Sequence, residues 1–244
     1  MKIGFFDSGI GGLTILNAVR GVLPEYDYLF YGDTKNVPYG DKTEEEIRTL
    51  TKSAVEYLFD RGAGLVVIAC NTASAESLRK LQDTMLDGAY SDRKILGVII
   101  PTIETIIDAD SKTVLIIGTN RTVNSQKYNR ELEKQNSSVK LITIATPTLV
   151  PLIEANQLQD AYDDLKTVVE DQTGEVDTVV LGCTHYTVLK NQLKSDFPKL
   201  KIISQDEVIP DKLKTYLENH PEIKLRLTKG KNLETFITGD AEQG

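Results

Sequence analysis

Two cysteines are the side chains in this sequence best suited to chemistry. Cys70 and Cys183 are the only cysteines in the 244-residue chain, which also contains two histidines. Without close spacing among these residues a zinc site is a poor fit, and a reducing compartment would keep the two thiols from forming a disulfide. Each cysteine is therefore either a small buried hydrophobic residue or a free thiol with a chemical role.

Cys70 stands where an apolar run meets polar residues, in the segment GLVVIACNTA (Gly64–Ala73). The run predicts a buried strand, and the residues after it predict a helix that Asn71 or Thr72 would cap. A thiol at a helix N-terminus lies near unpaired N–H groups and the positive end of the helix dipole, which stabilise a thiolate. This position favours a functional thiol over a merely buried one.

Cys183 has a similar context in DTVVLGCTHY (Asp177–Tyr186). His185 follows it by two residues, with Thr184 between them, and could orient a ligand or manage the thiol's proton. A lone histidine is usually structural, but this combination at a strand end favours function. The recurring pattern indicates two similar halves, each with a cysteine at the carboxyl end of a strand, where ligands bind in open α/β sheets.

The opening segment FFDSGIGGLT (Phe5–Thr14) is a predicted strand, a polar turn and a glycine-rich helix entry. It matches neither the dinucleotide-binding pattern nor the phosphate-binding P-loop. Its glycine N–H groups could face a carboxylate, and Asp7 could meet a substrate ammonium group or hydrogen-bond a neighbouring thiol. Alternatively, Asp7 and Ser8 simply cap the helix.

Other polar residues after predicted strands are weaker candidates for the same site. Each has an ordinary alternative, because Pro-Tyr-Gly forms turns, threonines cap helices and a glutamate at a helix end is usually solvated. The candidates are Pro38, Tyr39 and Gly40 in one loop, Thr119 and Thr122 in another, and Glu154, which could orient His185.

Short apolar runs alternate with longer amphipathic segments, which predicts parallel β-α-β units and an α/β fold. The expected strands are Lys2–Phe6, Tyr28–Tyr31, Leu65–Ala69, Ile95–Ile99, Thr113–Ile117, Lys140–Ile144, Thr178–Leu181 and Lys201–Ile203. Helices are expected between most of them, for example at Thr43–Asp60, Ser74–Leu86, Val123–Gln135, Leu158–Gln172 and Val188–Asp196. We expect two similar α/β halves whose cysteines point into one cleft.

Composition narrows the class of protein. The formal charge of −8 argues against nucleic-acid binding, which needs a basic surface, and 40% hydrophobic residues is ordinary for a globular enzyme. No stretch approaches the roughly 18 consecutive apolar residues of a membrane helix, and the N-terminus has no signal-peptide pattern. We therefore expect a cytoplasmic protein with neither a nucleic-acid nor a membrane partner.

Together these motifs resemble the glutamate racemase family, one of the aspartate/glutamate racemases. The similar segments, in the same order, are Phe5–Thr14, Tyr31–Gly40, Ala69–Ser74, Val150–Glu154 and Leu181–Tyr186. The resemblance implies two parallel-sheet α/β domains related by a pseudo-twofold, with no cofactor and no metal. It implies that Cys70 acts on the α-proton of D-glutamate and Cys183 on that of L-glutamate. The substrate-binding residues it implies are Asp7, Ser8, Tyr39, Gly40, Asn71, Thr72, Thr184 and His185.

The resemblance also sets expectations for organisation and role. Residues 1–96 and 206–244 would form the domain that carries Cys70, and residues 97–205 the domain that carries Cys183. A homodimer is compatible with the family, and D-glutamate would supply peptidoglycan synthesis. Ile100 and Thr146 depart from the family pattern, where an acidic residue and a cysteine are common, and leave substrate preference open. Rival interpretations are an aspartate or other amino-acid racemase, a non-catalytic amino-acid-binding protein, and a hydrolase that uses one cysteine with His185.

Overall fold

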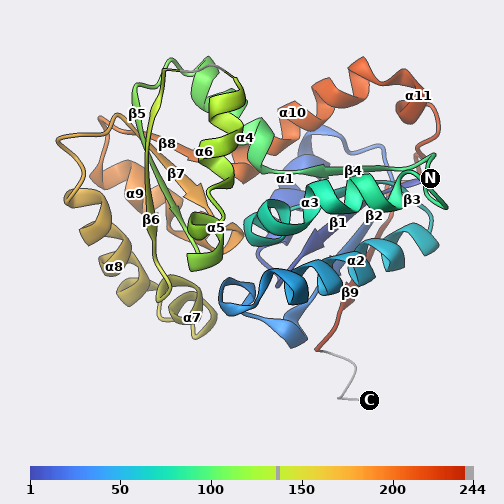
Figure 1. Cartoon of the computed structure of the whole chain (residues 1–244), viewed down its shortest axis with the longest axis horizontal. Helices are drawn as coiled ribbons and strands as arrows, with labels where there is room; N and C mark the ends of the chain where they lie inside the picture. The colour runs from blue at the N-terminus through green and yellow to red at the C-terminus, as the bar shows by residue number, and fades with distance from the viewer. Residues whose placement is uncertain (136–137, 240–244) are drawn as a thin grey trace.

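The computed structural model describes residues 1–135 and 138–239, which form two α/β halves side by side (Figure 1). Each half is built on one sheet in which every pair of neighbouring strands is parallel. Sheet A contains, in spatial order, β4 (Lys94–Gly97), β3 (Ala63–Ile68), β1 (Lys2–Asp7), β2 (Tyr28–Gly32) and β9 (Leu233–Ile237). Sheet B contains β6 (Lys140–Ala145), β5 (Thr113–Gly118), β7 (Thr178–Gly182) and β8 (Lys201–Ser204).

Helices pack around both sheets. With sheet A lie α1 (Gly12–Val22), α2 (Glu44–Asp60) and α3 (Asn71–Met85), and with sheet B lie α5 (Asn120–Asn124), α6 (Lys127–Lys134), α7 (Leu149–Glu154), α8 (Leu158–Glu170) and α9 (Lys190–Asp196) (Figure 1). The remaining α-helices are α4 (Ile99–Asp108), α10 (Gln205–Asn219) and α11 (Pro221–Lys224). Three 3-10 helices are η1 (Thr34–Asn36), η2 (Tyr39–Asp41) and η3 (Thr184–Leu189).

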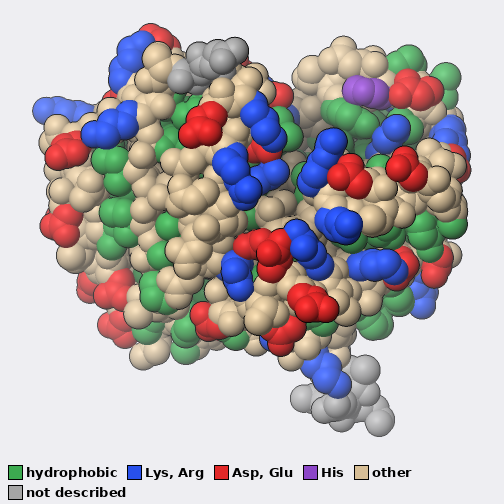
Figure 2. Space-filling model, viewed as in Figure 1, with side chains coloured by type: hydrophobic (Ala, Val, Ile, Leu, Met, Phe, Trp, Pro, Cys, Tyr) green, Lys and Arg blue, Asp and Glu red, His purple; other side chains and the backbone are tan. Residues whose placement is uncertain are grey.

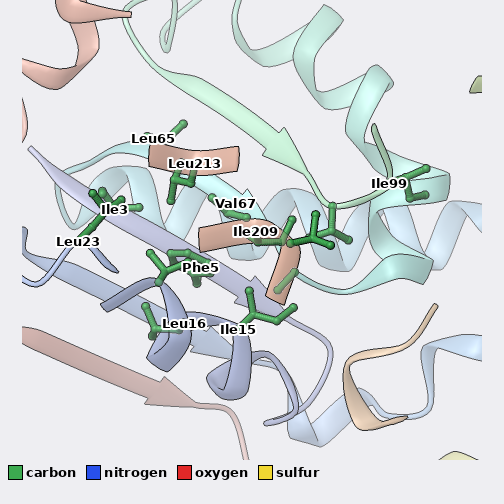
Figure 3. Close-up of a cluster of buried hydrophobic side chains, with 14 of the residues drawn as sticks. Ile3, Phe5, Ile15, Leu16, Leu23, Leu65, Val67, Ile99, Ile209 and Leu213 are labelled. Atoms are coloured by element: carbon green, nitrogen blue, oxygen red, sulfur yellow. The ribbon is translucent and has the colours of Figure 1, made fainter. Parts of the chain in front are cut away.

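Sheet A is buried on both faces, as a parallel sheet between helices should be. On one face, Ile3, Phe5, Leu65 and Val67 of the central strands pack with side chains of α1 and α10 (Figure 3). On the other face, strand residues such as Phe6 pack with α2 and α3. Fully burying each such side chain contributes roughly 1.5–3 kcal/mol, so the central strands are held firmly. This rigidity fixes the ends of β1 and β3, where the candidate residues begin.

The chain passes between the halves twice before it ends. It leaves sheet A after β4 and reaches sheet B through α4, and it leaves sheet B after β8 through α10, which packs against α1. The last strand, β9, then pairs with β2 at the edge of sheet A. The two cysteine-bearing halves are therefore connected at the points where α4 and α10 begin.

The prediction of a parallel α/β fold with two sheets is confirmed, as are all eight predicted strands. The predicted strand Ile95–Ile99 extends too far, because β4 ends at Gly97 and Ile99 begins α4. The strand β9 was not predicted. The predicted helix Val123–Gln135 is not continuous: it covers the end of α5 and all of α6, which Gln126 separates by adopting a left-handed conformation with φ 52°. The predicted helix Val188–Asp196 starts within the 3-10 helix η3. No helix in the described parts of the chain is long and apolar enough to cross a membrane.

Candidate active site

Both thiols line one small cavity between the two halves. Cys70 lies just beyond the carboxyl end of β3 in sheet A, and Cys183 directly follows β7 in sheet B. The cavity volume is about 40 Å³, above the roughly 10–15 Å³ that a cavity needs to hold one water molecule. The two thiols therefore share one cavity although they belong to different halves of the molecule.

Most of the residues singled out in the sequence meet at this cavity. Those that line it are Ser8, Pro38, Tyr39, Gly40, Cys70, Asn71, Thr72, Thr119, Cys183, Thr184 and His185. Three others lie behind the lining and hydrogen-bond to it, namely Asp7, Thr122 and Glu154. Segments that are far apart in the sequence therefore converge on one small volume.

Cys70 is itself the N-cap of α3, so the expectation that Asn71 or Thr72 would be the cap is wrong. The Cys70 sulfur accepts a hydrogen bond from the Ala73 N–H at 3.5 Å and lies 3.2 Å from Oγ of Ser8. Burial and the nearby Asp7 carboxylate raise the pKa of the Cys70 thiol to about 12, while the Ser8 and Ala73 hydrogen bonds act in the opposite direction. The raised pKa favours the thiol form of Cys70 over the thiolate.

Cys183 has a different environment. It is followed by the 3-10 helix η3 and its side chain makes no capping hydrogen bond, so it does not repeat the geometry of Cys70. Its sulfur lies 3.7 Å from Nδ1 of His185, and Nε2 of His185 lies 3.1 Å from Oε1 of Glu154. Burial lowers the pKa of His185, but hydrogen bonds to Cys183 and Glu154 outweigh burial and raise it to about 11. His185 therefore places a group that can carry positive charge beside the Cys183 sulfur.

Asp7 is fully buried and joins the two halves. Its carboxylate accepts hydrogen bonds from the N–H groups of Gly9 (3.3 Å) and Gly12 (3.0 Å) and from the hydroxyl of Thr184 (3.3 Å). The N–H groups of Gly9 and Gly12, which could have faced a substrate carboxylate, are therefore directed at Asp7. Asp7 thus binds the first N–H of α1, whose N-cap is Gly11, and Thr184 links it to the lining of the cavity.

A group of threonine hydroxyls forms another part of the site. Thr72 Oγ1 lies 2.9 Å from Thr119 Oγ1 and 3.2 Å from Thr122 Oγ1, and Thr119 and Thr122 are 3.1 Å apart. Thr119 also caps α5 by accepting from the Thr122 N–H, so its capping role and its place at the cavity coexist. Hydroxyl groups can reorient, which makes this group a source of hydrogen-bond donors for an anion in the cavity.

Asp33 anchors the loop that carries Tyr39 and Gly40 through a hydrogen bond from Tyr39. Tyr39 donates its hydroxyl hydrogen to Asp33 at 2.7 Å, and Thr238, just after β9, donates to the other carboxylate oxygen at 2.9 Å. A Cβ atom on Gly40 would lie 3.0 Å from Cβ of Thr119, so a glycine permits the loop to approach the other half closely. The late segment around Thr238 thus supports one wall of the cavity.

Contacts between the halves also surround the cavity. Arg121 of α5 donates from Nε (3.1 Å) and Nη2 (2.9 Å) to the backbone carbonyl of Lys42, which follows η2. Its guanidinium lies 3.8 Å from Glu76 of α3. Figure 2 shows charged side chains of both signs gathered where the halves meet on this face. Opening the cavity toward Arg121 would require these contacts to break.

Sequence reasoning missed several residues of the site. Thr146, noted only as a departure from a family pattern, lines the cavity and lies 2.9 Å from the Tyr186 hydroxyl. Gln205 and Tyr128 hydrogen-bond to Asn71 although no local motif marks either residue. Over residues 1–135 and 138–239, no group of three or more His, Cys, Asp or Glu side chains is arranged to hold a metal ion.

Comparison with known proteins places this geometry in a family context. The sequence model described as Asp/Glu/Hydantoin racemase matches residues 14–209. A glutamate racemase from Aquifex aeolicus is 36% identical over 245 residues, covering 97% of this chain and 92% of the relative. The crystal structure of a Bacillus anthracis glutamate racemase isoform has a TM-score of 0.86 and 30% identity, covering 99% of this chain and 90% of that one. A Francisella tularensis glutamate racemase in complex with D-glutamate has a TM-score of 0.82 and 26% identity, covering 97% and 88%.

Proposed function

Because the chain belongs to the Asp/Glu/Hydantoin racemase family and is therefore an isomerase, we propose that it interconverts L- and D-glutamate by moving the α-proton between two thiols. The observation that carries this proposal is the presence of Cys70 and Cys183 in one cavity, at the ends of strands from separate sheets. A single base tends to return the proton to the face it came from. Two thiols on opposite sides of the α-carbon allow inversion.

In the L-to-D direction, the Cys183 thiolate takes the α-proton, and the electron pair left on the α-carbon delocalises into the carboxylate. The Cys70 thiol then donates its proton to the opposite face, which leaves Cys183 as a thiol and Cys70 as a thiolate. The reverse direction uses the same groups with the roles exchanged. The raised pKa of Cys70 supports its role as the proton donor in this direction, and His185 places a group that can carry positive charge beside Cys183.

Charge that develops on the substrate carboxylate needs fixed donors. The hydroxyls of Thr72 and Thr119 and the carboxamide of Asn71 line the cavity. Asn71 and Thr72 directly follow Cys70 in the sequence, and Thr119, from the other half, lies 2.9 Å from Thr72. Donors already oriented in a buried site stabilise such charge strongly, and removing one typically costs about 10²–10³-fold in rate. These residues would therefore bind the substrate and also stabilise the carbanion.

Glutamate as substrate is tested by direct racemisation assays. We expect the purified protein, dialysed against EDTA and assayed with the carbonyl reagent hydroxylamine, to convert each enantiomer of glutamate into the other, as measured by chiral chromatography. Parallel assays with D- and L-aspartate provide the comparison. Faster turnover of aspartate than of glutamate, or loss of activity after chelation, would contradict the proposal.

A role in supplying D-glutamate for peptidoglycan, in the cytoplasm, follows from the proposed reaction and from the resemblance of the motifs. We expect expression of the chain to allow a bacterial strain that requires D-glutamate to grow without it. The variant with both Cys70 and Cys183 changed to serine is the matched control, since it should leave the requirement in place. Growth that depends on D-glutamate despite measurable racemisation in the lysate would separate the enzyme activity from this cellular role.

A further inference from the structure

Behind the cavity, three buried polar side chains from three helices form a closed hydrogen-bonded ring. Asn71 is the first residue of α3, Tyr128 lies in α6 and Gln205 is the first residue of α10. Asn71 Nδ2 donates to Gln205 Oε1 at 2.8 Å, and Gln205 Nε2 donates back to Asn71 Oδ1 at 2.9 Å. The Tyr128 hydroxyl donates to Asn71 Oδ1 at 2.8 Å and accepts from Gln205 Nε2 at 3.2 Å.

The hydrogen-bonding capacity of Asn71 shows what the ring leaves free. A carboxamide has two acceptor lone pairs on its oxygen and two N–H donors. Tyr128 and Gln205 occupy both lone pairs of Oδ1, and Gln205 Oε1 takes one N–H. No second acceptor for Nδ2 is found among residues 1–135 and 138–239, and Asn71 lines the cavity beside Cys70. The ring therefore leaves one donor, and no acceptor, available on Asn71.

We propose that Gln205 and Tyr128 are positioning residues that hold the Asn71 carboxamide with an N–H available to the α-carboxylate of the substrate. The proposal rests on the proposed function, because it needs an α-amino acid in the cavity. Cys70 must reach the α-carbon, which carries both a carboxylate and an ammonium group. Asn71, the next residue, offers a donor and no acceptor, so the carboxylate is the group that it can bind. Turning over the Asn71 amide alone would set its NH2 group against the Gln205 NH2 group and break the ring.

The ring also explains why these residues come from distant parts of the chain. Asn71 belongs to the half with sheet A, Tyr128 lies on α6 beside sheet B, and Gln205 stands where the chain leaves β8 for α10 (Figure 1). All three side chains are at most 2% exposed, so water does not compete for their hydrogen bonds. The donor on Asn71 is therefore set by contacts between the two halves.

Two variants remove parts of the ring. Tyr128→Phe deletes one donor to Asn71 Oδ1, and Gln205→Leu deletes both amide partners while keeping a similar side-chain size. We expect each to raise KM for glutamate about tenfold, the effect of losing a hydrogen bond to a charged group, with a smaller change in kcat. Tyr162→Phe is the matched control, because the Tyr162 hydroxyl hydrogen-bonds to Asp196 at 2.8 Å away from the cavity. It should leave KM unchanged.

Two substrate fragments show which group Asn71 contacts. Glutarate keeps both carboxylates of glutamate and lacks the ammonium group, whereas 4-aminobutyrate lacks the α-carboxylate. We expect the ring variants to weaken inhibition by glutarate in parallel with KM and to leave inhibition by 4-aminobutyrate unchanged. If Gln205→Leu or Tyr128→Phe lowers Tm but changes neither KM nor glutarate inhibition, the ring is only structural and the proposal is wrong.

The conservative Tyr128→Phe variant gives the answer if Gln205→Leu does not fold. If the wild-type protein racemises no amino acid, the proposed function fails, and calorimetric titration with glutarate still compares the wild type with the ring variants. Equal glutarate affinity in all of them would then overturn the proposed role of the ring by itself.

Discussion

The Nδ1 atom of His185 lies 3.7 Å from the sulfur of Cys183. The other thiol, Cys70, has neutral partners, the Ser8 hydroxyl and the Ala73 N–H. One thiol therefore adjoins a group that can carry positive charge, whereas the other is buried beside a carboxylate that raises its pKa. The two halves supply chemically unequal thiols to one cavity, although a racemase must work in both directions.

Replacing His185 tests whether its charge contributes to proton transfer. We expect His185→Gln to lower kcat/KM for glutamate about 10²-fold, the low end of what a general acid–base group contributes. L- and D-glutamate have equal free energy, so kcat/KM must fall by the same factor in both directions even though the thiol beside His185 is Cys183. His220→Gln is the matched control, because His220 stacks on Tyr216 at 4.0 Å, remote from the thiols. An unchanged rate for His185→Gln would exclude the role.

The Glu154 carboxylate should influence how kcat/KM depends on pH. Hydrogen bonding to Glu154 raises the pKa of His185 and so extends the pH range in which the imidazole stays protonated. Glu154→Gln removes that charge, and we expect the alkaline limb of the kcat/KM profile to move to lower pH, with little change near neutrality. Glu175→Gln, at an exposed position, is the control. A shift toward higher pH would show that the sign of this coupling is wrong.

Local patterns were enough to find the strands and the residues flanking each cysteine, because these signals lie within a few positions of one another. β9 was missed because its sequence LETFI is partly polar, and it forms a strand by pairing with β2 at the sheet edge. The break at Gln126 was missed because no glycine or proline marks it. Neither feature can be recognised before the tertiary contacts are known.

The residues of the site divide in the same way into those that a local sequence pattern marks and those that only tertiary contacts bring together. Thr184 and His185 were identified from their proximity to Cys183 in the sequence, and both line the cavity. Gln205 and Tyr128 gave no local signal, because their partner Asn71 is distant in the sequence and meets them only when the halves come together. The N–H groups of Gly9 and Gly12 do face a carboxylate, but it is the one on Asp7, because buried donors find acceptors within the protein.

Two glycines of α1 allow a matched stability experiment. A Cβ atom on Gly12 would lie 2.6 Å from Cβ of Asp7, whereas one on Gly21 meets nothing within 4 Å. We expect Gly12→Ala to lower the free energy of unfolding by about 1–3 kcal/mol through overpacking. Gly21→Ala should raise it by up to about 1 kcal/mol through helix propensity. Urea denaturation of both variants measures the difference, and equal stabilities would contradict the tight contact between Gly12 and Asp7.

The last prediction separates the two thiols. Serine is a far weaker acid than cysteine and cannot supply the thiolate, so Cys70→Ser and Cys183→Ser should each reduce racemisation about 10³-fold or more. Each variant keeps one base. In heavy water we expect Cys70→Ser to exchange the α-proton of L-glutamate without inversion, and Cys183→Ser to do so with D-glutamate, as measured by NMR.

The double Cys→Ser variant is the blank and should exchange neither isomer. Racemisation near the wild-type rate in either single variant would rule out two-base transfer, because one thiol would then be enough. If Cys70→Ser instead exchanges D-glutamate and Cys183→Ser exchanges L-glutamate, two-base transfer still holds. Only the assignment of each cysteine to one face of the α-carbon would then be reversed.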